Sequence, residues 1–403
     1  MATPRRLLHR ALDGLDDGQV TLAEGANATV HGDGQPCVRI EVHRPAFYRR
    51  VILGGVLGAA ESYIDGDWDC DDLVALVRLV AHSRRTQQAV DRKRRFASCI
   101  DRWQHHRRRN TRRGSASNIA AHYDLGNEFF RLFLDERMMY SCALYEQASA
   151  SLDVAATAKL ELLCRKLRLR PEDHLLEIGG GWGGLAVYAA KRHGCRVTTA
   201  TLSPAQYAHT VSLVRQHRLE DRVEVQLRDY RDLVGQFDKL VSVEMIEAVG
   251  HRFLPDYFRA CARLLKPDGL MALQAITIRD QRYRQALHSV DFIKKHIFPG
   301  GFIPCVSVLV ENAARQCDAV LVHLDDLGAD YARTLRAWRT RFDAQADAIK
   351  SLGFDERFRR MWRFYFCYCE GGFLERAISD VQMLFAMPAY RGPVRLPAQE
   401  AAA

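Results

Sequence analysis

The sequence lacks the features that would place it in several broad classes of protein. No uncharged apolar run reaches the roughly 18 residues that a membrane-spanning helix needs, and the longest candidate, residues 297–310, is broken by prolines and glycines. The 11 cysteines form no Cys-x-x-Cys pair, so neither a disulfide framework nor a zinc ribbon is indicated and a reducing cytoplasm fits. Residues 1–17 contain no apolar core, so we expect no signal peptide. No internal repeat is present.

What remains is an ordinary globular composition with one unusual segment. The 403 residues are 48% hydrophobic and 27% charged, which suits two or three domains with a sizeable core. The net charge of +9 is concentrated in residues 84–113, which hold twelve Lys or Arg and only two Asp. Within this segment Phe96, Ile100 and Trp103 recur at helical spacing. The segment therefore predicts either an amphipathic helix on an anionic membrane surface or a solvated linker. Without a recognisable binding fold, nucleic acid is not an expected partner.

The pattern of apolar residues changes along the chain. Residues 1–83 contain a strand-like stretch at 37–43 and a short helical one at 71–80, which indicates a small α+β domain. From about residue 155, strands alternate with helices. The expected strands are 174–178, 196–202, 223–227, 239–243 and 270–278, and the expected helices are 185–193, 204–217 and 253–265. This alternation predicts an α/β fold with a doubly wound, mostly parallel Rossmann-like sheet. Residues 333–350 and 358–383 read as further helices.

A glycine-rich turn follows the first of these strands. Residues 175–184 read Leu-Leu-Glu-Ile-Gly-Gly-Gly-Trp-Gly-Gly, and Gly179, Gly181 and Gly184 satisfy the dinucleotide pattern GxGxxG. A nicotinamide-dependent dehydrogenase would place an acid at the end of the second strand, and the sequence there has none. The acid is Glu177, inside the loop's own strand. A carboxylate at this point suits the cationic amino-acid end of S-adenosylmethionine, and the alternative is a tightly packed turn.

The ends of the next two strands carry further candidates. Ser203, Pro204 and Gln206 have the spacing of an N-cap, a first helical residue and a capping box. Thr201, Leu202 and Gln206 would also lie where doubly wound sheets bind nucleosides. Asp229 and Tyr230 follow the third strand, where they would either reach an adenine or form a strand-terminating turn.

Eight ordered motifs resemble the cyclopropane-fatty-acyl-phospholipid synthase and mycolic acid synthase family. They are His122–Asn127, Met139–Ala143, Glu177–Gly184, Thr201–Gln206, Asp229–Asp232, Val243–Gly250, Ile297–Gly301 and Gly328–Tyr331. Residues 54–55 and 63–68 resemble the N-terminal domain of bacterial cyclopropane synthases more loosely. On this basis we divide the chain into an N-terminal domain (1–83) with a lipid or membrane role, a basic linker (84–117), a catalytic methyltransferase domain with additional helices (118–390) and a tail (391–403).

The resemblance implies methylene transfer from S-adenosylmethionine to a cis double bond of a phospholipid acyl chain. The cofactor residues would be Tyr140, Ser141, Gly179, Gly181, Thr201, Leu202, Gln206, Asp229 and Tyr230, together with Glu177. Bicarbonate would be the base, with ligands at Cys142, Glu247, Gln274, the backbone of Ile276, and Tyr331. Cys369 matches a cysteine proposed as active in the family, and a packed helical cysteine is the alternative. The resemblance also implies a cytoplasmic homodimer at the inner face of the membrane.

The chemistry explains why such a site needs a base. An alkene is a weak nucleophile, so the methyl donor must be held in line with it in a dry site. Methyl transfer leaves a carbocation, and a weak base then removes a proton from the new methyl group to close the ring. The sequence departs from the family at Gln274 and Ala248, where His is frequent, and at Gly180, where Cys is frequent. Two alternatives therefore stay open: a fatty-acyl C-methyltransferase without ring closure and, more distantly, a non-enzymatic lipid-binding protein.

Overall fold

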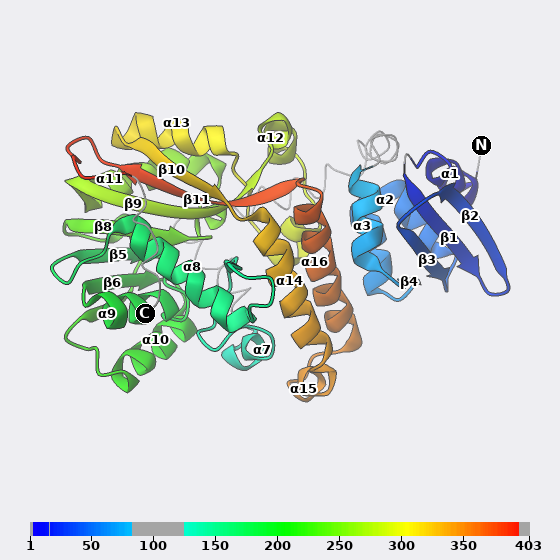
Figure 1. The fold of residues 1–403 in the computed structure, drawn as a ribbon. Coiled ribbons are helices and arrows are strands. Elements are labelled where there is room, and N and C mark those ends of the chain that lie inside the picture. The colour runs from blue at the N-terminus through cyan, green and yellow to red at the C-terminus, as the bar shows by residue number, and fades with distance from the viewer. Residues whose placement is uncertain (1–2, 16, 83–124, 395–403) are drawn as a thin grey trace. The chain divides into compact units, whose positions relative to one another are not determined.

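The computed structural model describes residues 3–15, 17–82 and 125–394 (Figure 1). The basic segment 84–113, and the amphipathic helix predicted in it, lie outside these residues. The chain divides into two compact units, and each is described by itself. Unit 1 comprises residues 1–107, 288–299 and 332–378; unit 2 comprises 108–287, 300–331 and 379–403. This division differs from the contiguous 118–390 domain expected from the sequence, because two later segments group with the N-terminal residues.

Unit 1 combines a small sheet with helices from three parts of the chain. Its four strands, in spatial order β2-β1-β3-β4, are β1 (Gly18–Glu24), β2 (Asn27–Asp33), β3 (Cys37–Val42) and β4 (Trp68–Cys70). Its helical elements are α1 (Pro4–Leu12), α2 (Ala46–Ile64), α3 (Leu73–His82), η4 (Ile293–Ile297), α15 (Ala346–Ser351), α16 (Glu356–Leu374) and most of α14 (Gly328–Asp343). The predicted strand at 37–43 and helix at 71–80 are both confirmed, with small shifts of their ends.

Unit 2 is built on a seven-stranded sheet with the order β10-β11-β9-β8-β5-β6-β7. The strands are β5 (His174–Ile178), β6 (Arg196–Thr201), β7 (Val223–Leu227), β8 (Phe237–Val243), β9 (Leu265–Ile278), β10 (Val320–Asp326) and β11 (Ile378–Ala386). Strands β5 to β9 pair in parallel, and β10 pairs antiparallel with β11. The doubly wound α/β sheet predicted from the sequence is confirmed, with five of its strands within a few residues of their predicted positions.

Helices cover both faces of this sheet. They are α8 (Leu152–Leu167), α9 (Gly184–His193), α10 (Pro204–Gln216), α11 (Leu254–Leu264) and α13 (Val306–Cys317), with the shorter α7 (Asn127–Arg131) and α12 (Asp280–Leu287) nearby. Buried residues of α11 and α13 form one apolar cluster with the sheet, and those of α8 and α9 form a second. Figure 1 shows these two groups of helices on opposite faces. Two apolar cores with the sheet between them are the usual arrangement of a doubly wound fold.

The helix predicted over 358–383 is wrong in its last part. Helix α16 ends at Leu374, and residues 378–386 form β11. The last seven residues of β11 are all buried, the polar Asp380 and Gln382 among them, so the strand lacks the alternation of buried and exposed residues that distinguishes a strand from a helix. Strand β10 was not predicted at all. Among the described helices, none has the length and apolar character that crossing a bilayer requires.

Candidate active site

The candidate site of unit 2 lies at the carboxyl ends of the parallel strands. Strand β5 pairs with β6 on one side and β8 on the other, so the strand order reverses at β5. Doubly wound folds bind ligands at such a reversal. The glycine turn begins here: Gly179 and Gly181 have φ of +86° and +53°, and a Cβ on Gly181 would meet no protein atom within 4 Å. The backbone of Gly181 therefore faces open space.

Glu177 lies in β5 beneath the turn and is buried. The hydroxyl of Thr199, on β6, donates a hydrogen bond of 2.6 Å to its carboxylate. Burial raises the pKa of Glu177 to about 7. A Cβ on Gly180 would lie 1.9 Å from the Thr199 hydroxyl oxygen. This contact explains why glycine stands at position 180: the Glu177–Thr199 pair occupies the space that a side chain there would need.

The end of β6 carries the predicted N-cap. The Ser203 hydroxyl accepts a hydrogen bond from the Gln206 backbone N–H, and Pro204 begins α10. The predicted capping box is wrong, because the Gln206 amide oxygen accepts a hydrogen bond from the Thr201 hydroxyl at 2.8 Å instead. That same hydroxyl oxygen accepts a hydrogen bond from the Ser203 N–H. Thr201 and Gln206 are therefore fixed by each other, and Leu202 lies between them in the chain, partly buried.

The candidates after β7 form a turn. Asp229 caps the short helix Tyr230–Asp232 and pairs with Arg231 at 2.6 Å. The Tyr230 ring packs edge-on against Tyr257, and burial raises the pKa of Tyr230 above its usual range. These contacts are typical of a strand-terminating turn, one of the two alternatives that the sequence suggested for Asp229 and Tyr230.

Tyr140 and Ser141 precede the candidate cysteine. The ring of Tyr140 packs against Phe130 and Phe133. Ser141 is buried, and its hydroxyl accepts a 2.7 Å hydrogen bond from the ammonium group of Lys159, which is itself fully buried on α8. A buried ammonium group needs nearby negative charge, and the carboxylates of Glu244 and Asp135 interact favourably with Lys159.

Glu244 collects hydrogen bonds from three distant parts of the chain. Its carboxylate accepts from the Cys142 backbone N–H at 2.7 Å, the Gln274 side-chain amide at 2.8 Å and the Tyr331 hydroxyl at 2.6 Å. Glu244 has a φ of +47°, a conformation that a residue other than glycine rarely adopts and that clusters at functional sites. In the sequence, Glu244 is only one residue of the motif Val243–Gly250. Its partners are too far away in sequence for a local pattern to identify it.

Glu247 and Asp380 add two further buried carboxyl groups. Glu247 accepts a 2.6 Å hydrogen bond from the Ile276 backbone N–H through one oxygen, and its other oxygen, Oε2, is buried without a partner. Burial, with the nearby charge of Glu244, raises its pKa to about 8. Neither carboxylate oxygen of Asp380 has a hydrogen-bond partner. Burial raises the pKa of Asp380 well above its usual range, and Glu244 and Glu247 add to this effect.

A chain of amides fixes the orientation of Gln274. The Lys166 ammonium donates to the Gln382 side-chain oxygen at 2.9 Å, so the Gln382 NH₂ group must face the other way. That NH₂ group donates to the Gln274 side-chain oxygen at 3.0 Å. The Gln274 NH₂ group is then left to face Glu244 and the Cys142 carbonyl. Asp325 pairs with Lys166 at 2.6 Å and completes the chain.

The structure thus brings together five of the six predicted catalytic residues in unit 2, and Glu244, Asp380 and Lys159 join them. The Cys142 thiol donates to the carbonyls of Ala143 and Leu327, and burial raises its pKa well above the usual range. Cys369 belongs to α16 of unit 1. Burial raises its pKa above the usual range as well, so both groups are thiols and not thiolate nucleophiles.

The predicted bicarbonate ligands are already engaged by side chains of the chain itself. The N–H of Cys142, the amide of Gln274 and the hydroxyl of Tyr331 donate to Glu244, and the N–H of Ile276 donates to Glu247. Among the described residues, only one of the predicted ligands, Glu247, keeps an unpartnered polar atom, Oε2, and one such atom cannot hold a small anion by itself. The residues present therefore do not fit a bicarbonate ion held by these donors.

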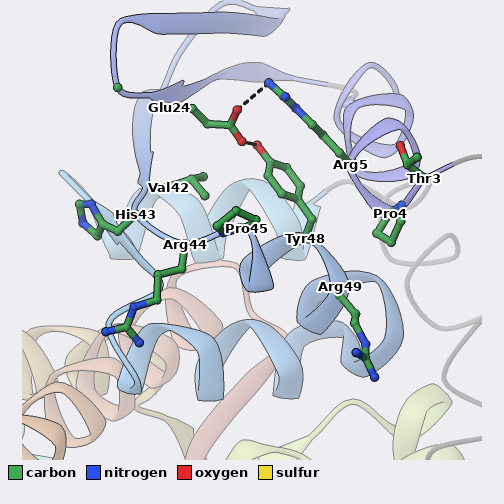
Figure 2. A pocket seen from close by; sticks show the side chains of 11 residues that line it. Thr3, Pro4, Arg5, Glu24, Val42, His43, Arg44, Pro45, Tyr48 and Arg49 are labelled. Carbon is green, nitrogen blue, oxygen red and sulfur yellow. Dashed lines mark hydrogen bonds and ion pairs between the residues drawn. The ribbon is translucent and has the colours of Figure 1, made fainter.

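Unit 1 has a cavity of its own, of about 440 Å³, between α1 and the start of α2. Figure 2 shows Glu24 between Arg5 and Tyr48, bonded to both, while Arg44 and Arg49 point away from this carboxylate. Glu24 neutralises the charge of Arg5, and the side chains of Arg44 and Arg49 point elsewhere. The arginines of this cavity therefore do not converge to form an anion-binding site.

A glycine turn at the strand-order reversal, with polar side chains after the next strands, is the arrangement of an S-adenosylmethionine-dependent methyltransferase, and this chain is one. The family model for mycolic acid cyclopropane synthetase matches residues 110–383, and the chain belongs to this family. It is 39% identical over 345 residues to tuberculostearic acid methyltransferase UfaA1 of Mycobacterium tuberculosis, covering 82% of this chain and 79% of the relative.

Two further comparisons agree. The chain is 35% identical over 378 residues to the cyclopropane-fatty-acyl-phospholipid synthase of Escherichia coli, covering 91% of each. Among solved structures, mycolic acid cyclopropane synthase CmaA1 complexed with SAH and CTAB matches with a TM-score of 0.63 and 31% identity, covering 67% of this chain and 98% of that one. Membership of this family excludes the dehydrogenase interpretation of the glycine turn.

Proposed function

We propose that this protein transfers a one-carbon unit from S-adenosylmethionine to a cis double bond of a phospholipid acyl chain and closes a cyclopropane ring. The observation that carries the proposal is the cluster of buried carboxyl groups beside the cofactor turn. Transfer of a methyl group to an alkene carbon creates a cation that must lose a proton, so the reaction needs a proton acceptor in a dry site. The phospholipid substrate is supported by the similarity to the Escherichia coli synthase.

The chain's own residues would divide the work. The glycine turn allows the cofactor's amino-acid end to approach the backbone, and Thr201 and Gln206, which fix each other, offer polar atoms to its nucleoside. Glu244 and Glu247 are partly buried, which limits the water that would otherwise trap the cation. S-adenosylmethionine supplies the electrophilic methyl group when bound. No step is assigned to bicarbonate, because its predicted donors are engaged.

A second candidate is methylation without ring closure, leaving a methylene branch. The similarity to a tuberculostearic acid methyltransferase over 82% of the chain favours it. Both products arise by loss of one proton from the transferred methyl group, the methylene branch only after a hydride has moved from the methyl-bearing carbon to the cationic carbon, and they have the same mass. Mass spectrometry of the lipids identifies the substrate chain, and ¹H NMR of the purified fatty ester then distinguishes a ring methylene from an exocyclic double bond.

The test is to incubate the purified protein with S-adenosylmethionine and vesicles containing an unsaturated phosphatidylglycerol. A cyclopropane ester supports the proposal, and a methylene-branched ester supports the second candidate. An unmodified acyl chain across phosphatidylglycerol, phosphatidylethanolamine and the free fatty acid contradicts both. Cofactor binding without product would then point to another alkene.

We further propose that the protein works as a homodimer on the membrane surface, with the basic segment 84–113 in contact with anionic headgroups. The support is the concentration of positive charge there, because each basic residue near such a surface contributes about 1 kcal/mol. Co-sedimentation with vesicles, with and without phosphatidylglycerol, tests the membrane contact, and sedimentation velocity tests the dimer.

A further inference from the structure

We propose that Glu244 is the proton acceptor of this enzyme and that its side chain takes the place of a bicarbonate ion. The inference rests on the proposed function, because it names the base of that reaction. Two observations lead to it. The donors expected to bind bicarbonate donate to the carboxylate of Glu244, and this carboxylate resembles bicarbonate in shape and charge.

A bicarbonate ion and a glutamate side chain present the same group to their surroundings. Both offer two carboxylate oxygens in one plane, and both accept hydrogen bonds from N–H and O–H donors. The Cys142 N–H and the Gln274 amide donate to Glu244 Oε1, and the Tyr331 hydroxyl donates to Oε2. Three donors from separate parts of the chain converge on one carboxylate, as they would on a bound anion.

The surroundings select Glu244 as the ionised member of the cluster. Burial raises the pKa of Glu244, and the three hydrogen bonds with the positive charge of Lys159 oppose that effect and favour its charged form. Glu247 has one hydrogen-bond donor and a buried, unpartnered Oε2, and Asp380 has no partner on either oxygen. Because like charges at short range cannot all be present, the two poorly solvated groups hold their protons while Glu244 carries the charge.

The backbone at Glu244 supports a specific role. The φ of +47° is costly for any residue with a Cβ, and the Glu244 N–H donates to the Gln274 carbonyl oxygen. The strained backbone and the side-chain contacts together direct the carboxylate at the three donors. Oε2 accepts only the Tyr331 hydroxyl among the contacts described, so it keeps a lone pair for a proton.

The reaction balances without another reagent. The alkene π pair forms a bond to the methyl carbon as the carbon–sulfur bond breaks, and the sulfonium becomes a neutral thioether. The adjacent carbon is then a cation. Glu244 removes one proton from the new methyl group, and the released electron pair closes the ring onto the cationic carbon. For a methylene branch, the hydride on the methyl-bearing carbon first moves to the cationic carbon, so that the electron pair released by the same proton loss forms the double bond. The proton remains on Glu244 until product release admits water.

Two measurements on the native protein test the inference directly. Turnover should change by less than about twofold between carbon-dioxide-depleted buffer and buffer with added bicarbonate. In equilibrium dialysis with labelled bicarbonate, the native protein with S-adenosylmethionine bound should retain none above a reference protein. A strong bicarbonate requirement, or retention of about one equivalent, would overturn the inference.

Variants at position 244 supply the complementary result. Glu244→Gln keeps the shape but loses the charge, and its turnover should fall at least about 100-fold, as for loss of a general base. Glu244→Gly tolerates the positive φ and frees the three donors, so added bicarbonate should restore part of its activity and bind in dialysis. Calorimetry with S-adenosylmethionine should show binding by all three proteins, which establishes that they are folded.

The outcomes separate this inference from the proposed function. If the native protein modifies no unsaturated lipid, the proposed function fails, and the dialysis experiment still decides whether Glu244 excludes bicarbonate. If the native protein is active but Glu244→Gln retains normal turnover, the function stands and Glu244 is not the base.

Discussion

Replacing Glu247 with Gln should stabilise the protein at alkaline pH. Its pKa is raised from 4.5 to about 8, first by burial and then by the charge of Glu244. The folded protein therefore holds a proton that the unfolded chain releases above about pH 4.5. Stability falls as pH rises from there to about 8 and is then constant, because the unfolded state binds fewer protons over that interval. A glutamine has the same shape and no charge to desolvate.

The magnitude follows from the interval crossed in the measurement. Between pH 6 and pH 9 the native protein passes through about two pH units in which only the folded state holds this proton. At about 1.4 kcal/mol per unit, it should lose about 3 kcal/mol relative to Glu247→Gln. The carboxyl groups shared by both proteins largely cancel in this difference. At pH 6 the variant should already be the more stable protein by about 2 kcal/mol, because the unfolded Glu247 of the native protein is ionised above about pH 4.5 while the folded one keeps its proton.

Urea unfolding at pH 6 and pH 9, followed by circular dichroism, measures the difference. Asp238→Asn is a matched control: the hydrogen bond from Lys266 holds the pKa of Asp238 below its ordinary value against the opposing effect of desolvation. The Asp238→Asn substitution should lower the free energy of unfolding by the same amount at pH 6 and pH 9, because Asp238 is ionised at both. A Glu247→Gln difference that does not change between pH 6 and pH 9 would refute the reasoning, because Glu247 would then be ionised when folded. Turnover of this variant at pH 7 should fall by less than about tenfold.

Three further perturbations test other parts of the structure. Gly181→Val should weaken S-adenosylmethionine binding in calorimetry more than tenfold, whereas Gly353→Val, with a similarly positive φ and open surroundings, should leave affinity unchanged; equal effects would assign the loss to strain. Lys166→Met frees Gln274 to turn its oxygen toward Glu244, so turnover should fall about tenfold or more for one lost charged hydrogen bond, with little change in cofactor affinity; unchanged turnover would show that the amide chain positions nothing. Changing residues 107–109 from Arg to Glu should reduce co-sedimentation with anionic vesicles and flatten its salt dependence; undiminished binding would leave the segment a linker.

The local part of the fold could be predicted from the sequence, and the parts set by distant contacts could not. The strand at 174–178 and its neighbours alternate with helices that have clear caps, and the Ser203 N-cap depends on residues three apart. Strand β11 is buried along most of its length, so its composition resembles that of the helix before it. Its pairing with β10 and its place beside β9 in the sheet identify it as a strand.

The same difference applies to the candidate site. The glycine turn is a local motif, and its position was predicted from residues 179–184 alone. Glu244 becomes significant only through partners 102, 30 and 87 residues away, none of which a local pattern connects to it. Asp380 lies in a segment that the sequence assigned to a helix, so no argument from spacing could bring it to the site. The one sequence feature that points to an altered site is Gln274, where many members of the family have His.

That departure is consistent with a resident base. A histidine beside Glu244 could take up a proton, and the resulting ion pair would lower the basicity of the carboxylate. Gln274 has no charged form near neutral pH, and Gln382 with the Lys166 ammonium fixes which end of its amide faces Glu244. The amide therefore donates to the carboxylate in every step and never competes with it for the substrate proton. A bound bicarbonate ion would not need a neighbour that cannot titrate, because it could leave the site with the proton and be replaced by another ion. A glutamate must release its proton in place. Because Gln274 cannot titrate, the proton leaves this carboxylate through Tyr331 or through water admitted on product release.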